Sequence, residues 1–212
     1  VVYLIPGLFG APLKGLSGLL PAREKSEFNL DRVAGPALIT GSGASQMAPA
    51  SESGLCDEPL YGDFLYLPHG LRGYFELEQG LACARELGKP VLLDFKGHAC
   101  SNCKEMEAKV WSDPEVLRRL NENFVIIALY VDDRTKLPES KWITSSVDGK
   151  VKSTMGKVNE DIEISRFRTN ALPLYVITDH EGNPLNEPRQ HNLDVKAYID
   201  WLDEGYARFM AP

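Results

Sequence analysis

The sequence predicts an α/β fold in which helices cover both faces of a central mixed sheet. Short apolar runs alternate with segments of helical spacing along most of the chain, and this alternation is typical of a partly parallel sheet. After the last apolar run, a turn at 179–183 leads into a further short strand, and this antiparallel hairpin makes the sheet mixed. With 212 residues, 43% of them hydrophobic, the chain is long enough for one core and a sizeable appendage.

The spacing of apolar residues assigns the elements. Continuous apolar runs suit strands that are buried on both faces. We expect strands at 63–68, 90–95, 124–131 and 173–178. Helical spacing is clearest where Leu77, Leu81 and Ala84 form one stripe that ends before Gly88. On the same grounds we expect helices at 76–87, 103–111, 112–120, 160–167 and 194–209.

The first sixty residues differ in composition from the rest. Residues 1–13 are uncharged and mostly apolar, but Lys14 interrupts the run before the roughly 20 residues that a membrane span needs. We interpret 1–31 as a juxtamembrane tail or the end of a transmembrane helix, with a flexible N-terminal segment as the alternative. Residues 32–60 are rich in Gly, Ser, Ala and Pro, which predicts a flexible linker.

The folded domain is predicted to span 61–212, with an insert at 132–159. The insert is polar and irregular for its length, and its Asp148-Gly149 pair favours a hairpin turn at 147–150. The formal net charge of the chain is −7, and long basic runs are absent. Binding to nucleic acid needs clustered Lys and Arg, so we expect no nucleic-acid partner.

Two of the four cysteines form a C-x-x-C motif, Cys100-Ser101-Asn102-Cys103. The other two are far apart in sequence: we expect Cys56 to be an exposed or weakly packed thiol, and Cys83 to be buried as a small apolar residue. The motif follows the run 90–95 and opens a helix, where free N–H groups stabilise a thiolate. Cys100 is then the attacking thiol and Cys103 the resolving one, which leaves a redox-active Cys100–Cys103 disulfide.

Two other uses of C-x-x-C are weighed against thiol chemistry. A structural zinc site normally has four ligands, and His98 with the two cysteines supplies three. This zinc alternative stays open, without a second ligand pair to support it. Covalent haem attachment needs His directly after the second Cys, where this chain has Lys104. We therefore expect no metal and no cofactor other than the disulfide.

Three more residues are candidates for the site. Asp94 is a carboxylate inside an apolar run, and a buried lone charge tends to be protonated or functional. It could exchange a proton with Cys103; the alternative is a strand-end residue that faces water. Glu107 lies one helical turn after Cys103 and is either a second acid or an exposed helix residue. Pro173 opens a strand downstream and is either an ordinary strand start or a cis proline.

The run 91–104 (VLLDFKGHACSNCK), with Ala-Leu-Pro at 171–173, resembles the thioredoxin superfamily. In this resemblance Asp94 matches the buried Asp, Cys100 and Cys103 match the redox pair, and Pro173 matches the cis-Pro that faces it. A thioredoxin-like fold is thereby implied. The longer run 91–117 is similar to the C-terminal thioredoxin-like domain of the DsbD family of thiol:disulfide interchange proteins, in which a Glu at the place of Glu107 joins the Asp.

The resemblance covers about 74–209, and the segment 3–21 also resembles the end of the DsbD membrane domain. The W-C-G-P-C of thioredoxin itself is absent, because Ala99 precedes Cys100 and Ser-Asn fills the motif. The insert at 132–159 resembles the Bacteroidetes-type variants of the family.

What the DsbD resemblance implies is a protein-disulfide reductase on the periplasmic side of the bacterial inner membrane, membrane-anchored in the full-length protein. An upstream transmembrane domain would donate electrons, and periplasmic thioredoxin-like or cytochrome c maturation proteins would accept them. A periplasmic oxidant or isomerase on the same fold, or a metal-binding module without catalysis, remains the alternative.

Overall fold

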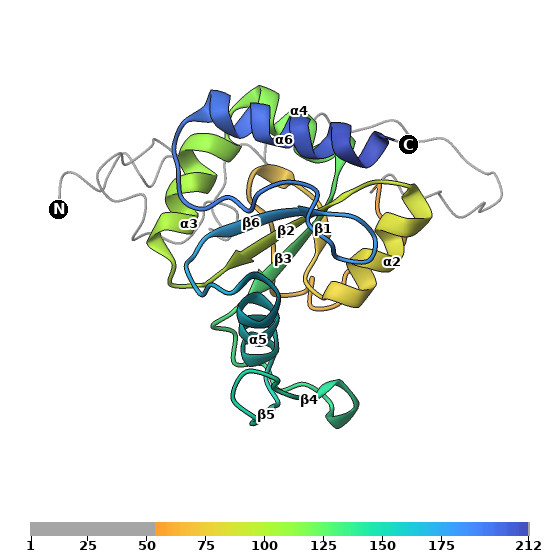
Figure 1. Cartoon of the computed structure of the whole chain (residues 1–212), viewed down its shortest axis with the longest axis vertical. Helices are drawn as coiled ribbons and strands as arrows, with labels where there is room; N and C mark the ends of the chain where they lie inside the picture. Colours follow the sequence, from red (N-terminus) through yellow and green to blue (C-terminus); the bar gives the residue numbers. More distant parts are fainter. Residues whose placement is uncertain (1–53, 212) are drawn as a thin grey trace, which may run out of the picture. The chain divides into compact units, whose positions relative to one another are not determined.

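The computed structural model describes residues 54–211; the tail predicted at 1–31 and the linker as far as residue 53 lie outside the described residues. A four-stranded sheet forms the centre of the domain (Figure 1). Its strands, in spatial order, are β1 (Gly73–Tyr74), β3 (Val125–Tyr130), β2 (Val91–Lys96) and β6 (Leu174–Thr178). β1 and β2 run parallel to β3, and β6 runs antiparallel to β2, so the predicted mixed sheet is confirmed.

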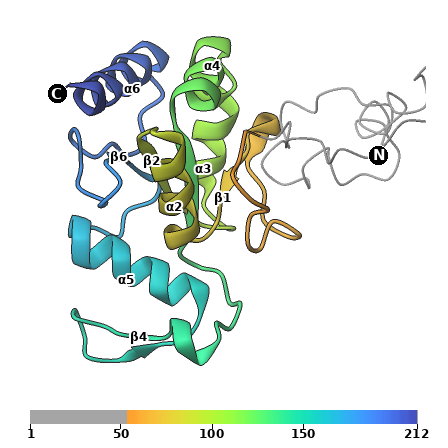
Figure 2. The ribbon, with the colours of Figure 1, turned by 90° about the vertical axis from the view of Figure 1, so that its right-hand side faces the viewer.

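Helices cover both faces of the sheet, as predicted (Figures 1 and 2). One face carries α3 (Ser101–Met106), the π-helical turn η5 (Glu107–Trp111), α4 (Pro114–Asn123) and α6 (Val195–Met210). The other face carries α2 (Leu77–Leu87) and the C-terminal part of α5 (Met155–Phe167). An apolar cluster on each side fills the space between helices and sheet, and burial of this apolar surface is the main force that holds the layers together.

Alternation along β2 decides which face each of its side chains reaches. Leu93 and Phe95 belong to the apolar cluster under α2, whereas Leu92 belongs to the cluster under α3, η5, α4 and α6. Asp94 and Lys96 lie two and four positions after Leu92, so their side chains point to the same face of the sheet as Leu92. Both charged side chains therefore enter the layer that also holds the C-x-x-C helix.

The strand predicted at 63–68 is wrong. These residues form a turn and an extended segment that leads into the short 3₁₀ helix η4 (Pro68–Gly70), and the edge strand is β1 instead. A Cβ at Gly73 would lie 2.4 Å from the carbonyl oxygen of Ile126, so only glycine permits this close pairing. The edge strand therefore forms at Gly73, where the small residue allows close pairing, and not at the apolar run 63–68.

The further strand predicted after the turn at 179–183 is reduced to two isolated bridges. Thr178 pairs with Pro184, and Tyr175 pairs with Arg189. Pro184 has no N–H to donate, which prevents a continuous ladder from starting there. The antiparallel character of the sheet thus comes from β6 rather than from a terminal hairpin.

The insert contains the predicted hairpin. Its two strands, β4 (Ile143–Thr144) and β5 (Val151–Lys152), pair antiparallel, and Gly149 in the turn has a φ of +70°. The short helix η6 (Glu139–Lys141) precedes them. In Figure 1 the hairpin lies at the bottom of the domain, beyond α5.

The helix predicted at 160–167 begins five residues earlier, at Met155, so the end of the predicted insert is helical. The N–H of Gly156 donates to the carbonyl oxygen of Asp133 at 3.0 Å. A Cβ at Gly156 would lie 2.6 Å from that oxygen, so the helix start needs a residue without a side chain. This close approach was not visible in the apolar spacing.

Cys56 is not a free thiol: it forms a disulfide with Cys83, 27 positions away. The end of the predicted linker, residues 54–60, is held against α2 and β1 by further contacts. The Tyr74 hydroxyl donates to Asp57 Oδ1 at 2.9 Å, and the Gln79 amide donates to Asp57 Oδ2 at 3.0 Å. Cys83 is buried, as predicted, but its partner was missed because distant cysteines carry no pairing signal in sequence.

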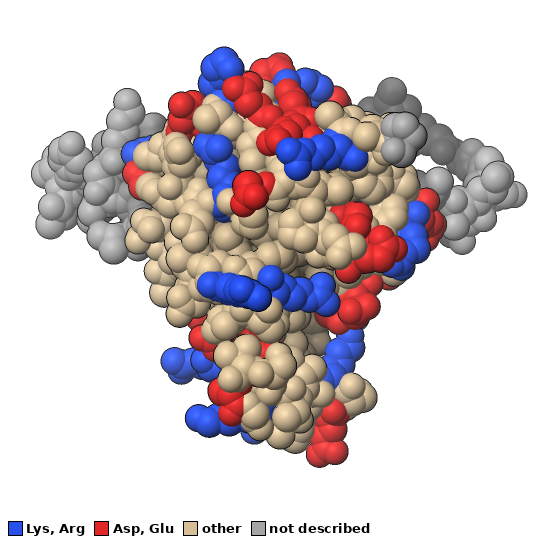
Figure 3. All heavy atoms as spheres, in the orientation of Figure 1, with Lys and Arg blue, Asp and Glu red and all other residues tan. Residues whose placement is uncertain are grey.

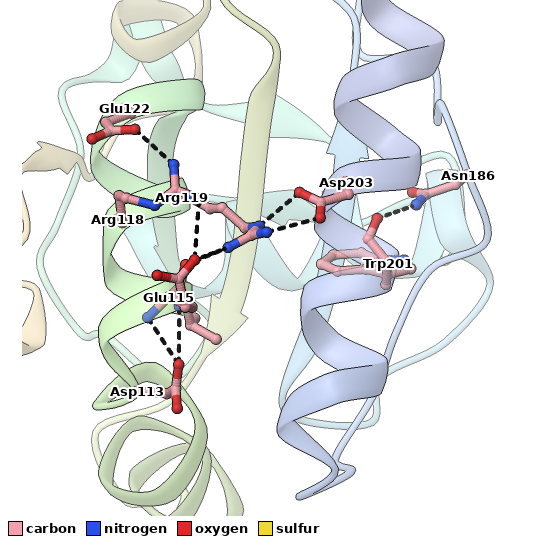
Figure 4. A network of polar contacts seen from close by, with 9 residues as sticks. Asp113, Glu115, Arg118, Arg119, Glu122, Asn186, Trp201 and Asp203 are labelled. Carbon is pink, nitrogen blue, oxygen red and sulfur yellow. Dashed lines mark hydrogen bonds and ion pairs between the residues drawn. The ribbon is translucent and has the colours of Figure 1, made fainter.

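Polar contacts join α4 to α6 on the outside of the domain (Figure 4). Asp113 caps α4 through the N–H of Glu115 at 2.9 Å. Arg119 then reaches from α4 to α6, where its guanidinium forms a bidentate pair with Asp203 at 2.7 and 3.0 Å.

On the face shown in Figure 3, acidic and basic side chains are interspersed. Within residues 54–211, no helix combines the length and the apolar composition that crossing a membrane requires.

Candidate active site

Cys100 and Cys103 form a disulfide at the start of α3, with a Cα–Cα separation of 5.3 Å. Cys100 is the N-cap residue, and its Sγ accepts the N–H of Cys103 at 3.1 Å. That N–H would stabilise a Cys100 thiolate in the same way. Cys100 is partly exposed, whereas Cys103 is 2% exposed. The exposure supports the predicted roles, because an incoming protein can reach only the first sulfur easily.

The loop between β2 and Cys100 is fixed by the first residues of the insert. The carboxylate of Asp132 accepts the N–H of His98 at 2.9 Å and that of Ala99 at 3.2 Å. A Cβ at Gly97 would lie 2.9 Å from the same carboxylate, which explains the glycine. The first residue of the insert thus holds the loop before Cys100 in place, a role that the sequence did not predict.

The side chain of His98 contacts an acid and an aromatic ring. Its Nε2 lies 2.8 Å from Asp133 Oδ2, and its ring stacks on Tyr130 with centroids 4.5 Å apart. Among residues 54–211, no group of three or more His, Cys, Asp or Glu side chains is arranged to hold a metal ion. The zinc alternative therefore rests on residue types alone.

Asp94 and Glu107 are brought together by a residue that sequence reasoning missed, Lys96. The Lys96 Nζ lies 3.4 Å from Asp94 Oδ2 and also pairs with Glu107 Oε1. Asp94 is 2% exposed and Lys96 is 4% exposed. The strand-end alternative for Asp94 is therefore wrong, as is the exposed-helix alternative for Glu107. The available signal was the alternation: Lys96 is two positions after Asp94 in a buried strand.

Burial sets the protonation of this cluster. It raises the pKa of Asp94 to about 6; the charge of Lys96 lowers that pKa and the charge of Glu107 raises it. Burial alone would lower the pKa of Lys96, but the two carboxylates outweigh it and hold that pKa above its ordinary value. Asp94 is therefore a group that can accept or give up a proton near neutral pH, as proton transfer to a thiol requires.

Pro173 stands at the same end of the sheet. The Leu172–Pro173 peptide bond is cis, and Pro173 is buried. Phe95 pairs with Leu174 in the antiparallel register of β2 and β6, so Pro173 comes beside the end of β2, from which the chain runs to Cys100. The cis alternative for this residue is thereby confirmed.

Comparison with known proteins agrees with this geometry. The profile of the thioredoxin-like domain family matches residues 77–189, more than half of the chain. Over 57 residues the chain is 42% identical to the thiol:disulfide interchange protein DsbD of Vibrio vulnificus, a match that covers 27% of this chain and 9% of that protein. Over 45 residues it is 49% identical to DsbD 1 of Pseudomonas aeruginosa, covering 21% and 8% respectively.

Among solved structures, the oxidised C-terminal domain of Neisseria meningitidis DsbD is 20% identical, with a TM-score of 0.41 over 59% of this chain and 89% of that one. The matched segments span less than a tenth of the length of the DsbD proteins from Vibrio vulnificus and Pseudomonas aeruginosa. The family profile covers β2, β3 and β6 of the sheet and the C-x-x-C helix, but not β1. The chain therefore belongs to the thioredoxin-like domain family, with the Cys100–Cys103 disulfide at the start of α3.

Proposed function

We propose that the protein is a protein-disulfide reductase, the outward-facing module of a membrane electron relay. The observation that carries the proposal is the pairing of a C-x-x-C at a helix N-terminus with a buried acid, Asp94, on the strand that leads to it. Cys100 supplies a reachable sulfur and Cys103 a protected one. This division suits a reductase that forms a covalent intermediate and then releases it.

The reaction balances with the residues present. The Cys100 thiolate attacks the disulfide of a partner, forms an S–S bond to one partner sulfur and expels the other as a thiolate, which takes up a proton. Cys103 then gives its proton to the Asp94 carboxylate and attacks Cys100. The Cys100–Cys103 disulfide forms, and the second partner sulfur leaves as a thiolate that is protonated by water. The partner gains two electrons and the protein is left oxidised.

Two observations support the location and the relay. Disulfides persist in oxidising compartments such as the periplasm, and Cys56–Cys83 is a disulfide outside the redox motif. The DsbD proteins of similar sequence are named as thiol:disulfide interchange proteins. We therefore place the domain in the periplasm, anchored by the segment 1–31, with a transmembrane donor upstream. Its acceptors would be thioredoxin-like or cytochrome c maturation proteins.

The test is reduction of a protein disulfide by the 212-residue chain, with excess dithiol as the electron source. Cys100→Ala should abolish the activity. Cys103→Ala should accumulate a mixed disulfide on Cys100, visible by mass spectrometry. A double variant, Cys56→Ala with Cys83→Ala, is the matched control and should keep the activity. Retained activity in Cys100→Ala would refute the mechanism.

The direction of electron flow needs its own measurement. Equilibration with glutathione buffers gives the potential of the Cys100–Cys103 pair. A potential in the region of about −270 mV would support the reductase, and one near about −120 mV would favour the oxidant or isomerase instead.

A further inference from the structure

A single buried cation lies between the two carboxylates of the site. Lys96 is the ion partner of both Asp94 and Glu107, and its ammonium also lies 5.4 Å from the centre of the Tyr130 ring. The side chain of Glu107 is 21% exposed, whereas those of Lys96 and Asp94 are 6% and 2% exposed. The cluster therefore carries two negative charges and one positive charge, with the most enclosed of the negative charges on Asp94.

Among residues 54–211, Lys96 supplies the positive charge that acts on Asp94. Glu107 from η5 also acts on Asp94, and the charge of Asp94 in turn raises the pKa values of three tyrosines around it, Tyr130 from β3, Tyr175 from β6 and Tyr198 from α6. Burial keeps these three tyrosines neutral near pH 7, because it raises their pKa values. Two enclosed carboxylates without a cation tend to retain one proton between them. Lys96 opposes this tendency.

We propose that Lys96 is the positioning residue that keeps Asp94 ionised at neutral pH and so makes it the acceptor of the Cys103 proton. This inference rests on the proposed function. The step it governs is the second one: the Cys103 proton moves to Asp94, the Cys103 sulfur bonds to Cys100, and the partner sulfur leaves with the electron pair. A protonated Asp94 cannot accept that proton, so the mixed disulfide would persist.

The contacts of Lys96 link β2 to the helical segment that begins at the C-x-x-C motif. Glu107 is four residues after Cys103 on one continuous helical path, because its N–H bonds to the Cys103 carbonyl. Side chains four apart lie on the same helix face. The Lys96 ammonium therefore joins the helix that carries Cys103 to the strand that carries Asp94.

The experiment separates the two chemical steps. Reduced protein is mixed with 5,5′-dithiobis(2-nitrobenzoate) between pH 5 and 9; the first thionitrobenzoate released reports attack by Cys100, and the second reports resolution by Cys103. We compare wild type with Lys96→Met, which removes the charge, and Lys96→Arg, which keeps it. Lys104→Met is the matched control, because it removes an exposed charge beside the same motif.

We expect the pH at which the rate of the second phase is half-maximal to be at least one pH unit higher in Lys96→Met than in wild type. The second phase should then be about five-fold slower at pH 6 and equal to wild type at pH 9. Lys96→Arg should restore the wild-type profile, and Lys104→Met should leave it unmoved. If Lys96→Met does not fold, Lys96→Gln, which can still donate hydrogen bonds to both carboxylates, takes its place.

The outcomes distinguish this inference from the proposed function. Suppose the charge-removing Lys96 variants show a normal first phase and the wild-type pH dependence of the second phase. The role of Lys96 is then refuted, and the proposed function stands. An equal change in Lys104→Met also overturns the role of Lys96, since a general charge effect would then suffice. If wild type releases no thionitrobenzoate through Cys100, the proposed function itself fails.

Discussion

Replacement of Asp94 by Asn should make the domain more stable at neutral pH and slower in exchange. The Asp94 carboxyl is 2% exposed, and burial raises its pKa from an ordinary value of 3.8 to about 6. The folded protein thus binds this proton more tightly than the unfolded chain does. Its stabilising effect is complete below pH 3.8 and is lost as pH rises through about 6. The amide side chain of the Asp94→Asn variant stays neutral throughout and escapes that loss.

The magnitude follows from the two pKa values. The difference between 3.8 and about 6 corresponds to about 3 kcal/mol of free energy of unfolding at pH 7. The stability of Asp94→Asn relative to wild type should therefore rise by about that amount between about pH 3 and pH 7, and stay level above. The gain in stability accompanies a loss of exchange rate, because Asn cannot accept the Cys103 proton.

Urea unfolding of the oxidised chain at several pH values measures this difference. Asp148→Asn is a suitable control, because Lys152 holds the pKa of the exposed Asp148 down at about 2. That replacement should lower stability at pH 7, by an amount that does not change between pH 5 and 8. A difference between Asp94→Asn and wild type that fails to grow from pH 4 to pH 7 would show that burial does not govern this carboxyl.

Three further predictions concern the rest of the domain. Loss of the Cys56–Cys83 bond, tested with a Cys56→Ala and Cys83→Ala double variant, should cost about 3.5 kcal/mol in urea unfolding, from the closure of a 27-residue separation, and an unchanged midpoint would contradict this. Burial raises the pKa of Glu163 to about 7, and in the described part its Oε1 has no hydrogen-bond partner. Glu163→Gln should therefore gain stability over wild type as pH rises from 4.5 through about 7 and keep that gain above it; a pH dependence equal to that of wild type would refute it. Gly156→Ala should destabilise the fold by about 1–3 kcal/mol, because the added Cβ meets backbone 2.6 Å away, and calorimetry showing wild-type stability would contradict that contact.

The redox motif and its acids could be found in the sequence because each has a local signature. Cys100 and Cys103 are three apart at the start of a helix, and Asp94 interrupts an apolar strand. The strands β2, β3 and β6 were predicted because continuous apolar runs betray burial on both faces. The edge strand β1 was missed because two residues carry no periodicity.

What the sequence could not show depends on contacts between distant segments. The Cys56–Cys83 disulfide joins residues 27 positions apart. The hydrogen bond from Ala99 to the Asp132 carboxylate spans 33 positions, and the one from Gly156 to the Asp133 carbonyl spans 23. No local pattern records such distances.

By itself, therefore, the sequence determined that this domain has a mixed α/β sheet and a C-x-x-C at a helix N-terminus, because apolar period and residue spacing are local properties. Only the tertiary structure decided how the acids behave. It enclosed Asp94, placed Lys96 between Asp94 and Glu107, and left Cys100 partly exposed above a buried Cys103. The protonation of a buried carboxyl depends on its desolvation and on the charges around it, and both are set by packing.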